Sequence, residues 1–535
     1  MRDEFVELVS QLEEIKAKID PVLLRLAEAR RAHLKEPTVA SRATLDTAQE
    51  QATELHIEYS RLVALLPAAT GLPPEELELL VEESRSDRTG ENRLLRETLT
   101  TDEIVPTAEI DDYLADALER VKSILPSGWL EEQPEEVARI DALAGQDAYL
   151  SLTKGVRPES ATHSLHRLRQ AIYVSQDYLN NEPFYDQFAG ALLVPALTRL
   201  ALQGSNLKHV GGERDERLDH LWKGPSQQVD ATLFELLTAA ACAEMGRSVE
   251  FISATSEKSP DIRCHDPYPL VIECKRQDPI SQYEAREEEL MRQLFLSLRA
   301  ASHKRGLHGT FHLELSVEAS TLDPEDVVQR LISQRLVPDP SRKLAYPWGA
   351  VAFLPRLGRV PLPGSTRIYS PNMLEFLFGW NSDLPTWDGI CCSIEAKGEP
   401  FIDEAREPIA LLWRNDAENA LKKRSWAPLN LFGKASFQIP PGEFGIIYVN
   451  YVEGARAKVA NMRQAAFAEK LQAFEHSAKV RIPISLLVRL YPRPLDHGQP
   501  DLIESNVRYL SAEYGDAELF DLFPTTIYTH QSEPG

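Results

Sequence analysis

The segment 259–275, SPDIRCHDPYPLVIECK, constrains the fold more than any other part of the chain. Its two apolar, strand-like runs, IRCH and LVIECKR, are separated by Asp-Pro-Tyr-Pro, and proline cannot continue a strand ladder. We therefore predict an antiparallel hairpin that turns at the Pro-Tyr step. Residues whose numbers sum to about 535 then face each other, which places Asp261 opposite Cys274 and within one position of Glu273 and Lys275.

Three charged side chains of this hairpin are expected to lie close together. Facing residues on antiparallel strands have Cβ atoms about 5 Å apart, and Glu273 and Lys275 leave the same face of their strand. Asp261 and Glu273 repel each other at that distance, and a divalent cation is their natural counter-ion. Lys275 would lie beside it, able to orient a water, as in sites that hydrolyse phosphodiesters. The alternative is a surface hairpin with a weak salt bridge between Glu273 and Lys275.

The segments on either side of the hairpin extend the pattern. Upstream, DATLFELLTAAACAEMG predicts a helix that Asp230 caps and Gly246 ends, with Glu235 in its first half, and SVEFISA predicts a strand. Downstream, the sequence predicts a polar helix over roughly 281–305 and then a strand at 309–319. The predicted order is therefore helix, three antiparallel strands, helix and strand.

The Glu-x-Lys pattern occurs at two other places, neither with the same surroundings. Glu14 belongs to a helical repeat of apolar residues and has no strand before it. Glu395 follows the strand-like run GICCSI, with Asp388 upstream, but seven residues of extended chain would hold these two carboxylates about 23 Å apart. Among these matches, the hairpin alone has a turn between its aspartate and its glutamate.

Pro-Asp at Asp261, followed by Glu273-x-Lys275 on the next strand, resembles the motif of the PD-(D/E)xK nuclease superfamily, over about 230–320. The resemblance implies a restriction-endonuclease-like fold, in which Asp261 and Glu273 bind Mg²⁺, or Mn²⁺ in its place, and Lys275 assists the attacking water. Some members of this superfamily carry a glutamate in the first core helix that joins the metal site. Glu235 matches that glutamate in type and place.

Composition and charge bear on where the chain acts and on what. No run of about 18 uncharged apolar residues occurs, so no membrane span is expected. The five cysteines are odd in number and form no Cys-x-x-Cys pair, which argues against a disulfide framework and favours the cytoplasm. The net charge of −24 opposes nucleic-acid binding. However, residues 1–150 hold 16 Lys and Arg against 33 Asp and Glu, a balance of −17, so most of the acidity lies away from the hairpin.

The chain is too long for one core, and we expect four parts. Residues 1–66 carry apolar stripes at spacings of three and four, which predict an α-helical hairpin arm that pairs with a second copy or a protein partner, or packs on its own chain. The sequence of residues 67–155 predicts an acidic linker and helical region. The nuclease-like domain is expected over 156–320, and 321–535 predict an α/β region of unassigned role. The expected fold class is α/β, a restriction-endonuclease-like mixed sheet flanked by helices.

The sequence thus predicts a Mg²⁺-dependent nuclease, with DNA favoured over RNA as its substrate. The chain carries no G-x-x-x-x-G-K-[ST] loop, and large nucleases without their own nucleotide motor resemble microbial restriction or antiviral-defence effectors. The competing hypothesis is a non-catalytic binding or scaffold protein that keeps a nuclease fold and assembles through its helical arm. The two hypotheses differ in whether Asp261 and Glu273 bind a divalent metal.

Overall fold

The computed structural model describes residues 107–130, 149–157, 165–253, 259–266, 268–333, 343–381, 386–395, 399–440, 442–475, 481–495, 498–510 and 523–528, together with Lys18, Arg25 and Thr47. The chain divides into two compact units, Met1–Asp102 with Ser532–Gly535, and Glu103–Gln531. The predicted helical arm lies outside the described residues apart from those three.

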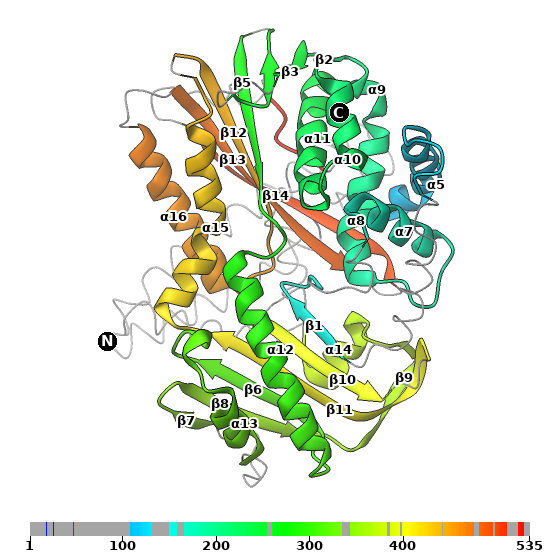
Figure 1. Ribbon diagram of the computed structural model, residues 1–535, viewed down its shortest axis with the longest axis vertical. Coiled ribbons are helices and arrows are strands. Elements are labelled where there is room, and N and C mark those ends of the chain that lie inside the picture. The colour runs from blue at the N-terminus through cyan, green and yellow to red at the C-terminus, as the bar shows by residue number, and fades with distance from the viewer. Residues whose placement is uncertain are drawn as a thin grey trace. The chain divides into compact units, whose positions relative to one another are not determined.

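Two seven-stranded mixed sheets with flanking helices form the second unit, which confirms the predicted α/β class (Figure 1). The first sheet has the strand order β14-β13-β12-β5-β4-β3-β2. Its strands are β2 (Val210–Gly212), β3 (Val249–Phe251), β4 (Ile262–Cys264), β5 (Leu270–Arg276), β12 (Phe444–Val452), β13 (Arg481–Pro494) and β14 (Pro500–Leu510). β3, β4 and β5 are antiparallel neighbours, whereas β5, β12 and β13 run parallel.

The second sheet has the order β1-β10-β11-β6-β8-β7, and β9 pairs with part of β11. Its strands are β1 (Leu150–Thr153), β6 (Gly309–Leu315), β7 (Leu344–Tyr346), β8 (Gly349–Pro355), β9 (Arg359–Arg367), β10 (Gly389–Glu395) and β11 (Phe401–Asn415). Helices α13 (Pro324–Ser333) and α14 (Pro371–Phe378) and the 3₁₀ turn Ala319–Thr321 belong to the same part of the chain. Each sheet therefore takes strands from both sides of residue 320.

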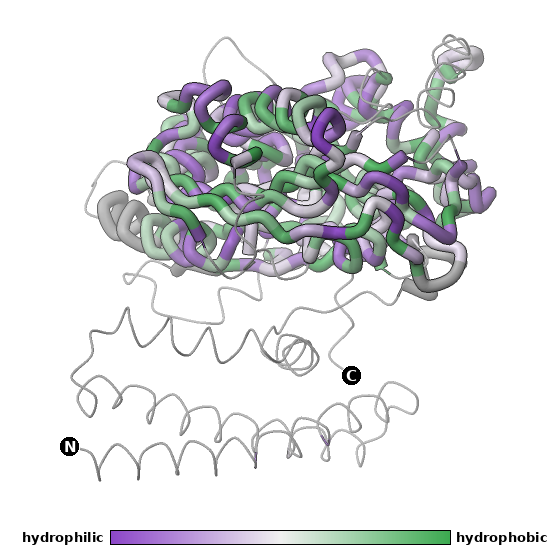
Figure 2. The backbone as a smooth tube through the Cα atoms, turned by 90° about the horizontal axis from the view of Figure 1, so that it is seen from below, coloured by the Kyte–Doolittle hydropathy of each residue, from purple (hydrophilic) through white to green (hydrophobic). Residues whose placement is uncertain are grey.

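Helices cover both faces of the first sheet (Figure 1). The apolar side chains of β4 and β5 that include Ile272 and Cys274 pack in one cluster with α11 (Val229–Glu244) and α8 (Gln187–Leu202). Val271, on the opposite face, packs with α15 (Glu418–Ser436) and α16 (Ala457–Glu475). Among the described residues before β3, the structure also has helices α5 (Thr107–Ser123), α7 (Arg167–Leu179), α9 (Gly204–Leu207) and α10 (Arg214–Lys223), and the 3₁₀ turn Ser226–Gln228. In Figure 2, hydrophobic and hydrophilic stretches alternate along the tube, as burial of one face of each element requires.

The predicted hairpin forms with nearly the predicted register. β4 and β5 occupy the two predicted runs, and Ile262 pairs with Ile272, so facing residues sum to one less than expected. Continued by one residue, this register places Asp261 opposite Glu273. The upstream helix also forms, and Gly246 follows its C-terminus with a φ of 78°, a left-handed conformation that glycine adopts without strain.

One local prediction around the hairpin was wrong, and one predicted strand forms but does not lie beside β5. Asp230 does not cap its helix: α11 begins one residue earlier, and the Asp230 carboxylate in its first turn accepts hydrogen bonds from Arg167 instead. The strand predicted at 309–319 forms as β6 but joins the second sheet, parallel to β11. The strand beside β5 is β12, which follows α15 far downstream. The segment between β5 and α15 is therefore a long insertion that carries most of the second sheet.

Helix α12 (Gln282–His303) leads from β5 into that insertion. Ser281 caps it with a capping box to Glu284, as expected for a helix that begins abruptly after a strand. Its later turns pack Met291, Phe295 and Leu298 with β6 and α13 in a separate core. One helix thus begins beside the first sheet and is buried against the second. No helix in the described ranges is long and apolar enough to cross a membrane.

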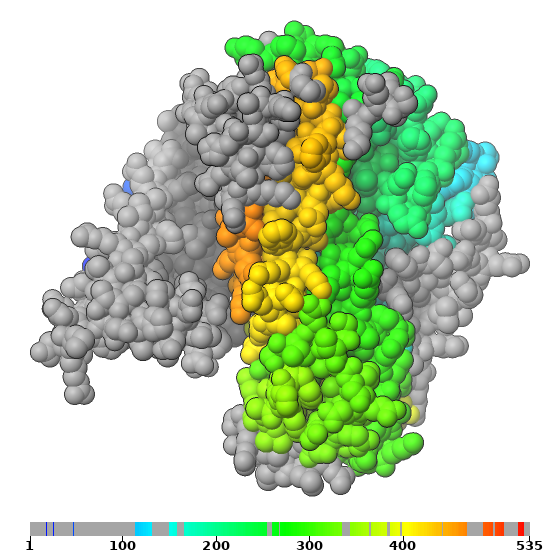
Figure 3. Space-filling view, turned by 60° about the vertical axis from the view of Figure 1, so that its left-hand side comes forward, coloured from blue at the N-terminus to red at the C-terminus, as the bar shows by residue number. Residues whose placement is uncertain are grey.

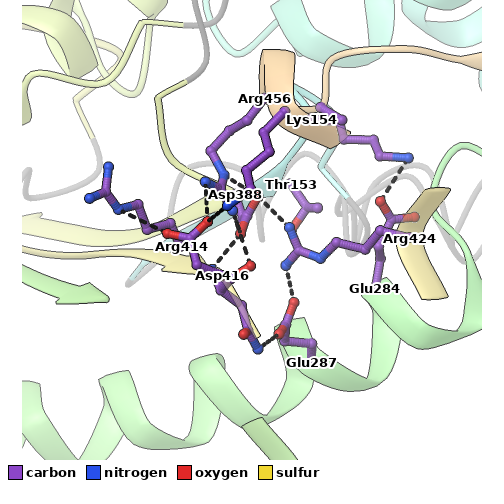
Figure 4. A network of polar contacts seen from close by, with 12 residues as sticks. Thr153, Lys154, Glu284, Glu287, Asp388, Arg414, Asp416, Arg424 and Arg456 are labelled. Atoms are coloured by element: carbon purple, nitrogen blue, oxygen red, sulfur yellow. Dashed lines mark hydrogen bonds and ion pairs between the residues drawn. The ribbon is translucent and has the colours of Figure 1, made fainter. Parts of the chain in front are cut away.

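A buried ionic network joins these elements (Figure 4). Arg424 of α15 contacts the carboxylates of Glu287 on α12 and Asp388 before β10. Arg456, just before α16, binds the same Asp388 at 2.8 Å and Asp416 at 3.0 Å. Burial alone would raise the pKa of Asp388, but the two guanidinium groups outweigh burial and lower it. Asp388 is therefore ionised and is fixed from two helices at once.

Arg424→Ala is expected to destabilise the second unit strongly, because it leaves the carboxylates of Glu287 and Asp388 buried without that cation. Loss of one member of a buried ion pair costs about 3–5 kcal/mol. The measurement is the urea midpoint of unfolding. Arg330→Ala is the matched control, since Arg330 pairs with Asp326 on an exposed helix face and such pairs contribute about 0–1 kcal/mol. Equal shifts for the two variants would contradict the role given to the network.

Candidate active site

Asp261 is fixed between two strands immediately before β4. Its backbone N–H donates to the carbonyl of Ile272 at 3.1 Å, and its own carbonyl accepts from the N–H of Ile252 at 3.0 Å. The side chain is buried, and its Oδ2 accepts a hydrogen bond from the backbone N–H of Cys274 at 2.8 Å. The carboxylate therefore bridges from the start of β4 to the middle of β5.

Glu273 and Lys275 project from the next part of β5. The Glu273 side chain is fully buried, and its Oε1 accepts a hydrogen bond from Lys275 Nζ. The other carboxylate oxygen, Oε2, has no hydrogen-bond partner in the described part of the chain. The Lys275 side chain is 24% exposed, so the ammonium group lies at the opening of an otherwise enclosed cluster. Asp261, Glu273 and Lys275 are thus brought together as predicted.

The alternation along β5 explains why these charges share one face. Cys274 and Ile272 point into the core on the α11 side, whereas Val271 packs with α15 and α16. Glu273 and Lys275 have the same parity as Val271 and therefore face the α15 side. Cys274, which lies between these two residues along the strand, is buried in the core.

Glu235 lies close enough to act electrostatically on the cluster. It belongs to the first half of α11, as predicted, and the Asp261 carboxylate raises its pKa whereas Lys275 lowers it. Its Oε2 also accepts a hydrogen bond from Arg217 of α10 at 2.7 Å. Sequence reasoning missed Arg217. The run RDERLDHLWK reads as a solvated helix, and no local pattern marks one of its arginines as the partner of a buried glutamate.

Burial and repulsion by neighbouring carboxylates favour the protonated forms of Glu273 and Glu235 at neutral pH. Burial, followed by the Asp261 carboxylate, raises the pKa of Glu273 to about 9 and that of Glu235 to about 8. Burial lowers the pKa of Lys275, but the Glu273 and Asp261 carboxylates outweigh burial and raise it. Lys275 is therefore a cation at neutral pH, beside carboxyl groups that would repel one another if all of them were ionised.

The donor set suits a divalent cation that keeps several waters. In the described ranges, no three Asp, Glu, His or Cys side chains are grouped closely enough to hold a metal between them. Mg²⁺ needs fewer, since it is usually bound by one or two carboxylates together with waters and substrate phosphates. Asp261 and the unbonded Oε2 of Glu273 fit that requirement. Glu235 is engaged with Arg217 and would have to release it to bind a metal directly.

The alternative motif has a different structural role. Asp388 precedes β10 and Glu395 ends it, at opposite ends of the strand, as the spacing predicted. Asp388 is occupied by Arg424 and Arg456. Arg424 follows Lys422 and Lys423 in a basic run of the sequence. Its side chain is buried in the ionic network, so it is not available to contact phosphate groups.

Comparisons with protein-family models, with curated proteins and with solved structures gave no match. The interpretation of the site therefore depends on its geometry and electrostatics.

Glu273→Gln is expected to flatten the pH dependence of stability in metal-free buffer. The pKa of Glu273 rises from an ordinary 4.5 to about 9 in the folded chain. Between these values the folded carboxyl keeps a proton that the unfolded chain releases, so the free energy of unfolding falls as pH rises through this window. The glutamine of the variant neither binds nor releases this proton, so its free energy of unfolding should fall less as the pH rises. Urea midpoints measured from about pH 5 to about pH 9 would show the difference.

The matched control is Glu395→Gln, which removes an exposed glutamate at the end of β10. It should follow the wild-type pH dependence. A Glu273→Gln variant that also follows it would show that the folded protein does not hold a proton at this position.

Proposed function

We propose that this chain is a Mg²⁺-dependent nuclease of the PD-(D/E)xK type, with a restriction-endonuclease-like core formed by α11, β3, β4, β5 and β12. The reaction is hydrolysis of a phosphodiester. Water adds to phosphorus, one phosphorus–oxygen ester bond breaks, and a phosphate monoester and a hydroxyl group result. Microbial restriction or antiviral defence is the biological setting that the resemblance suggests.

The observation that carries the proposal is the pair of facing carboxylates, Asp261 and Glu273, beside a partly exposed Lys275. A purely structural pair would be neutralised within the protein, because an unpaired buried charge is costly. Among the residues that the structure describes, Glu273 Oε2 has no hydrogen-bond partner, and burial raises the pKa of Glu273 despite its contact with Lys275. This excess of acidic groups supports a site that is completed by an added cation.

Asp261 and Glu273 would hold Mg²⁺, which when bound supplies positive charge to the scissile phosphate and lowers the pKa of a water molecule. The chain's own contribution comes mainly from Lys275. Because its pKa is raised, it remains an ammonium group and acts as a hydrogen-bond donor rather than as a base. It can orient the attacking water and offset the negative charge that develops on the phosphate oxygens. Glu235 and Arg217 would adjust the net charge of the cluster from the α11 side.

The Lys275→Ala variant is expected to lose metal-dependent cleavage. The assay offers plasmid, linear duplex, single-stranded DNA and RNA to the full-length chain with Mg²⁺, with Mn²⁺ and with EDTA. Removing a positioned charge from a phosphodiester site costs about 10²–10³ in rate. Lys304→Ala, at the exposed end of α12, is the matched control and should cut as the wild type does. Cleavage that is unchanged in Lys275→Ala would refute the proposed site.

A measurement of metal binding distinguishes a nuclease that needs a further partner to cut from a non-catalytic scaffold. At about pH 8, Mg²⁺ or Mn²⁺ should raise the thermal midpoint of the wild type but not that of Asp261→Ala, because binding to the folded state alone stabilises it. If neither protein responds and no substrate is cut, the scaffold hypothesis is favoured. A metal response in the wild type without cleavage would indicate an enzyme that needs a further partner.

A further inference from the structure

The outer face of α15 carries a stripe of polar and aromatic side chains that the proposed active site does not use. At 100° per residue, positions spaced by three and four along a helix fall on one side. The exposed members of this stripe are Asn419, Lys423, Trp426, Asn430, Lys434 and Phe437, the last at the C-cap. None of the six is acidic. We call this set the α15 stripe.

Its two aromatic residues are unusually exposed. The exposed fraction is 52% for Trp426 and 75% for Phe437, and the latter is the highest value for a large hydrophobic residue in the described ranges. By contrast, Leu429 and Phe432 on the inner face are buried against the first sheet. Figure 3 shows the outer surface of α15 as a yellow-to-gold strip between the green and orange parts of the molecule. The aromatic rings are therefore held at the surface by a well-packed helix.

The charge along the stripe is positive although the chain is strongly acidic. Lys434 has no ion-pair partner among the described residues, and it lies between the two aromatic positions. Lys422 pairs with the exposed Glu418, and Lys423 pairs with Glu318, whose side chain is 21% exposed. Exposed pairs of this kind are weak and can be exchanged for other anions.

The C-terminal end of the stripe approaches the proposed active site. α15 packs on the face of the first sheet from which Glu273 and Lys275 project. Just after its C-terminus, Gln438 Nε2 donates to the carbonyl of Ser259 at 3.2 Å, two residues before Asp261. The C-terminal end of α15 is therefore tied to the segment that precedes Asp261.

We infer that the α15 stripe binds a single-stranded stretch of the nucleic-acid substrate and directs it to Lys275. Bases would stack on Trp426 and Phe437, and phosphates would contact the lysines. The two aromatic positions are eleven residues apart, or about 16 Å along the helix axis, so they would engage separate nucleotides. The inference rests on the proposed function and specifies the form of its substrate.

The spacing of the stripe favours a nucleic acid over a protein partner. Protein interfaces bury their aromatic residues in a contiguous core from which charges are depleted. Here Asn430 and Lys434 separate the two rings. Alternation of aromatic and basic side chains suits a strand whose bases have π-faces and whose backbone is anionic, and such stacking tolerates any sequence. It also requires unpaired bases, which predicts a preference for single strands over duplex.

The test measures binding without cleavage. Fluorescence anisotropy of labelled single-stranded and duplex oligonucleotides, DNA and RNA, in EDTA compares wild type with Trp426→Ala/Phe437→Ala. The wild type is expected to bind single strands more tightly than duplex, and each lost aromatic should weaken single-strand binding at least about fivefold. Trp426→Phe should retain most of the affinity, because it keeps a ring to stack on. Lys434→Ala should reduce the slope of log affinity against log salt by about 0.7.

Phe376→Ala is the matched control, since Phe376 is a comparably exposed aromatic residue on α14. It should bind as the wild type does. Single-strand binding that survives in the double variant would overturn the inference. So would a change only in assembly state, which would mean that the stripe packs against a protein surface.

The two proposals fail separately. If cleavage depends on Lys275 but binding does not depend on the stripe, the proposed function stands and this inference falls. If binding depends on the stripe while Lys275→Ala cuts normally, the inference stands as a binding site and the proposed active site falls.

Discussion

The ion pairs that Arg424 makes with Glu287 and Asp388 join α15 to α12 and to the start of β10, and the rest of the unit depends on this contact. α12 leaves the first sheet at the proposed active site, and α15 returns to cover it. Between them the chain builds most of a second sheet. Without a fixed contact between these two helices, the long insertion would be free to displace the helix that packs over Glu273. Burial makes this contact specific, because none of these charges can be left alone in the interior without a large cost.

The proposed site follows the opposite electrostatic rule. In the ionic network, the buried carboxylates of Glu287 and Asp388 have guanidinium partners, and Arg424 and Arg456 lower the pKa of Asp388 although burial raises it. Around Asp261, two carboxyl groups have raised pKa values although Lys275 and Arg217 are close. Both clusters occur in one compact unit with similar burial. Under the proposed function, this difference separates carboxylates that are neutralised within the fold from carboxyl groups that a bound cation would neutralise.

Much of the local structure could be predicted from the sequence, and little of the long-range structure could. The Asp-Pro-Tyr-Pro turn and the alternation beside it define β4, β5 and their register to within one residue. Gly246 likewise marks the end of α11. By contrast, nothing near β5 reveals that its neighbour is β12 rather than β6, because strand pairing depends on which apolar edges meet after folding. Arg217 and Arg424 were missed for the same reason: each has its partner on another helix.

The separation of β5 from β12 has a consequence for biosynthesis. The ribosome must make the whole insertion after Arg276 before Phe444 and the strand that covers the free edge of β5 can emerge. At about 5–20 residues per second this takes roughly 10–30 s. Throughout that interval the nascent chain presents LVIEC, an apolar strand with an unpaired edge, which is the kind of segment that recruits chaperones or aggregates. The strands β6 to β11 of the second sheet are nearly consecutive in the sequence. They can therefore pair before β12 of the first sheet has been synthesised.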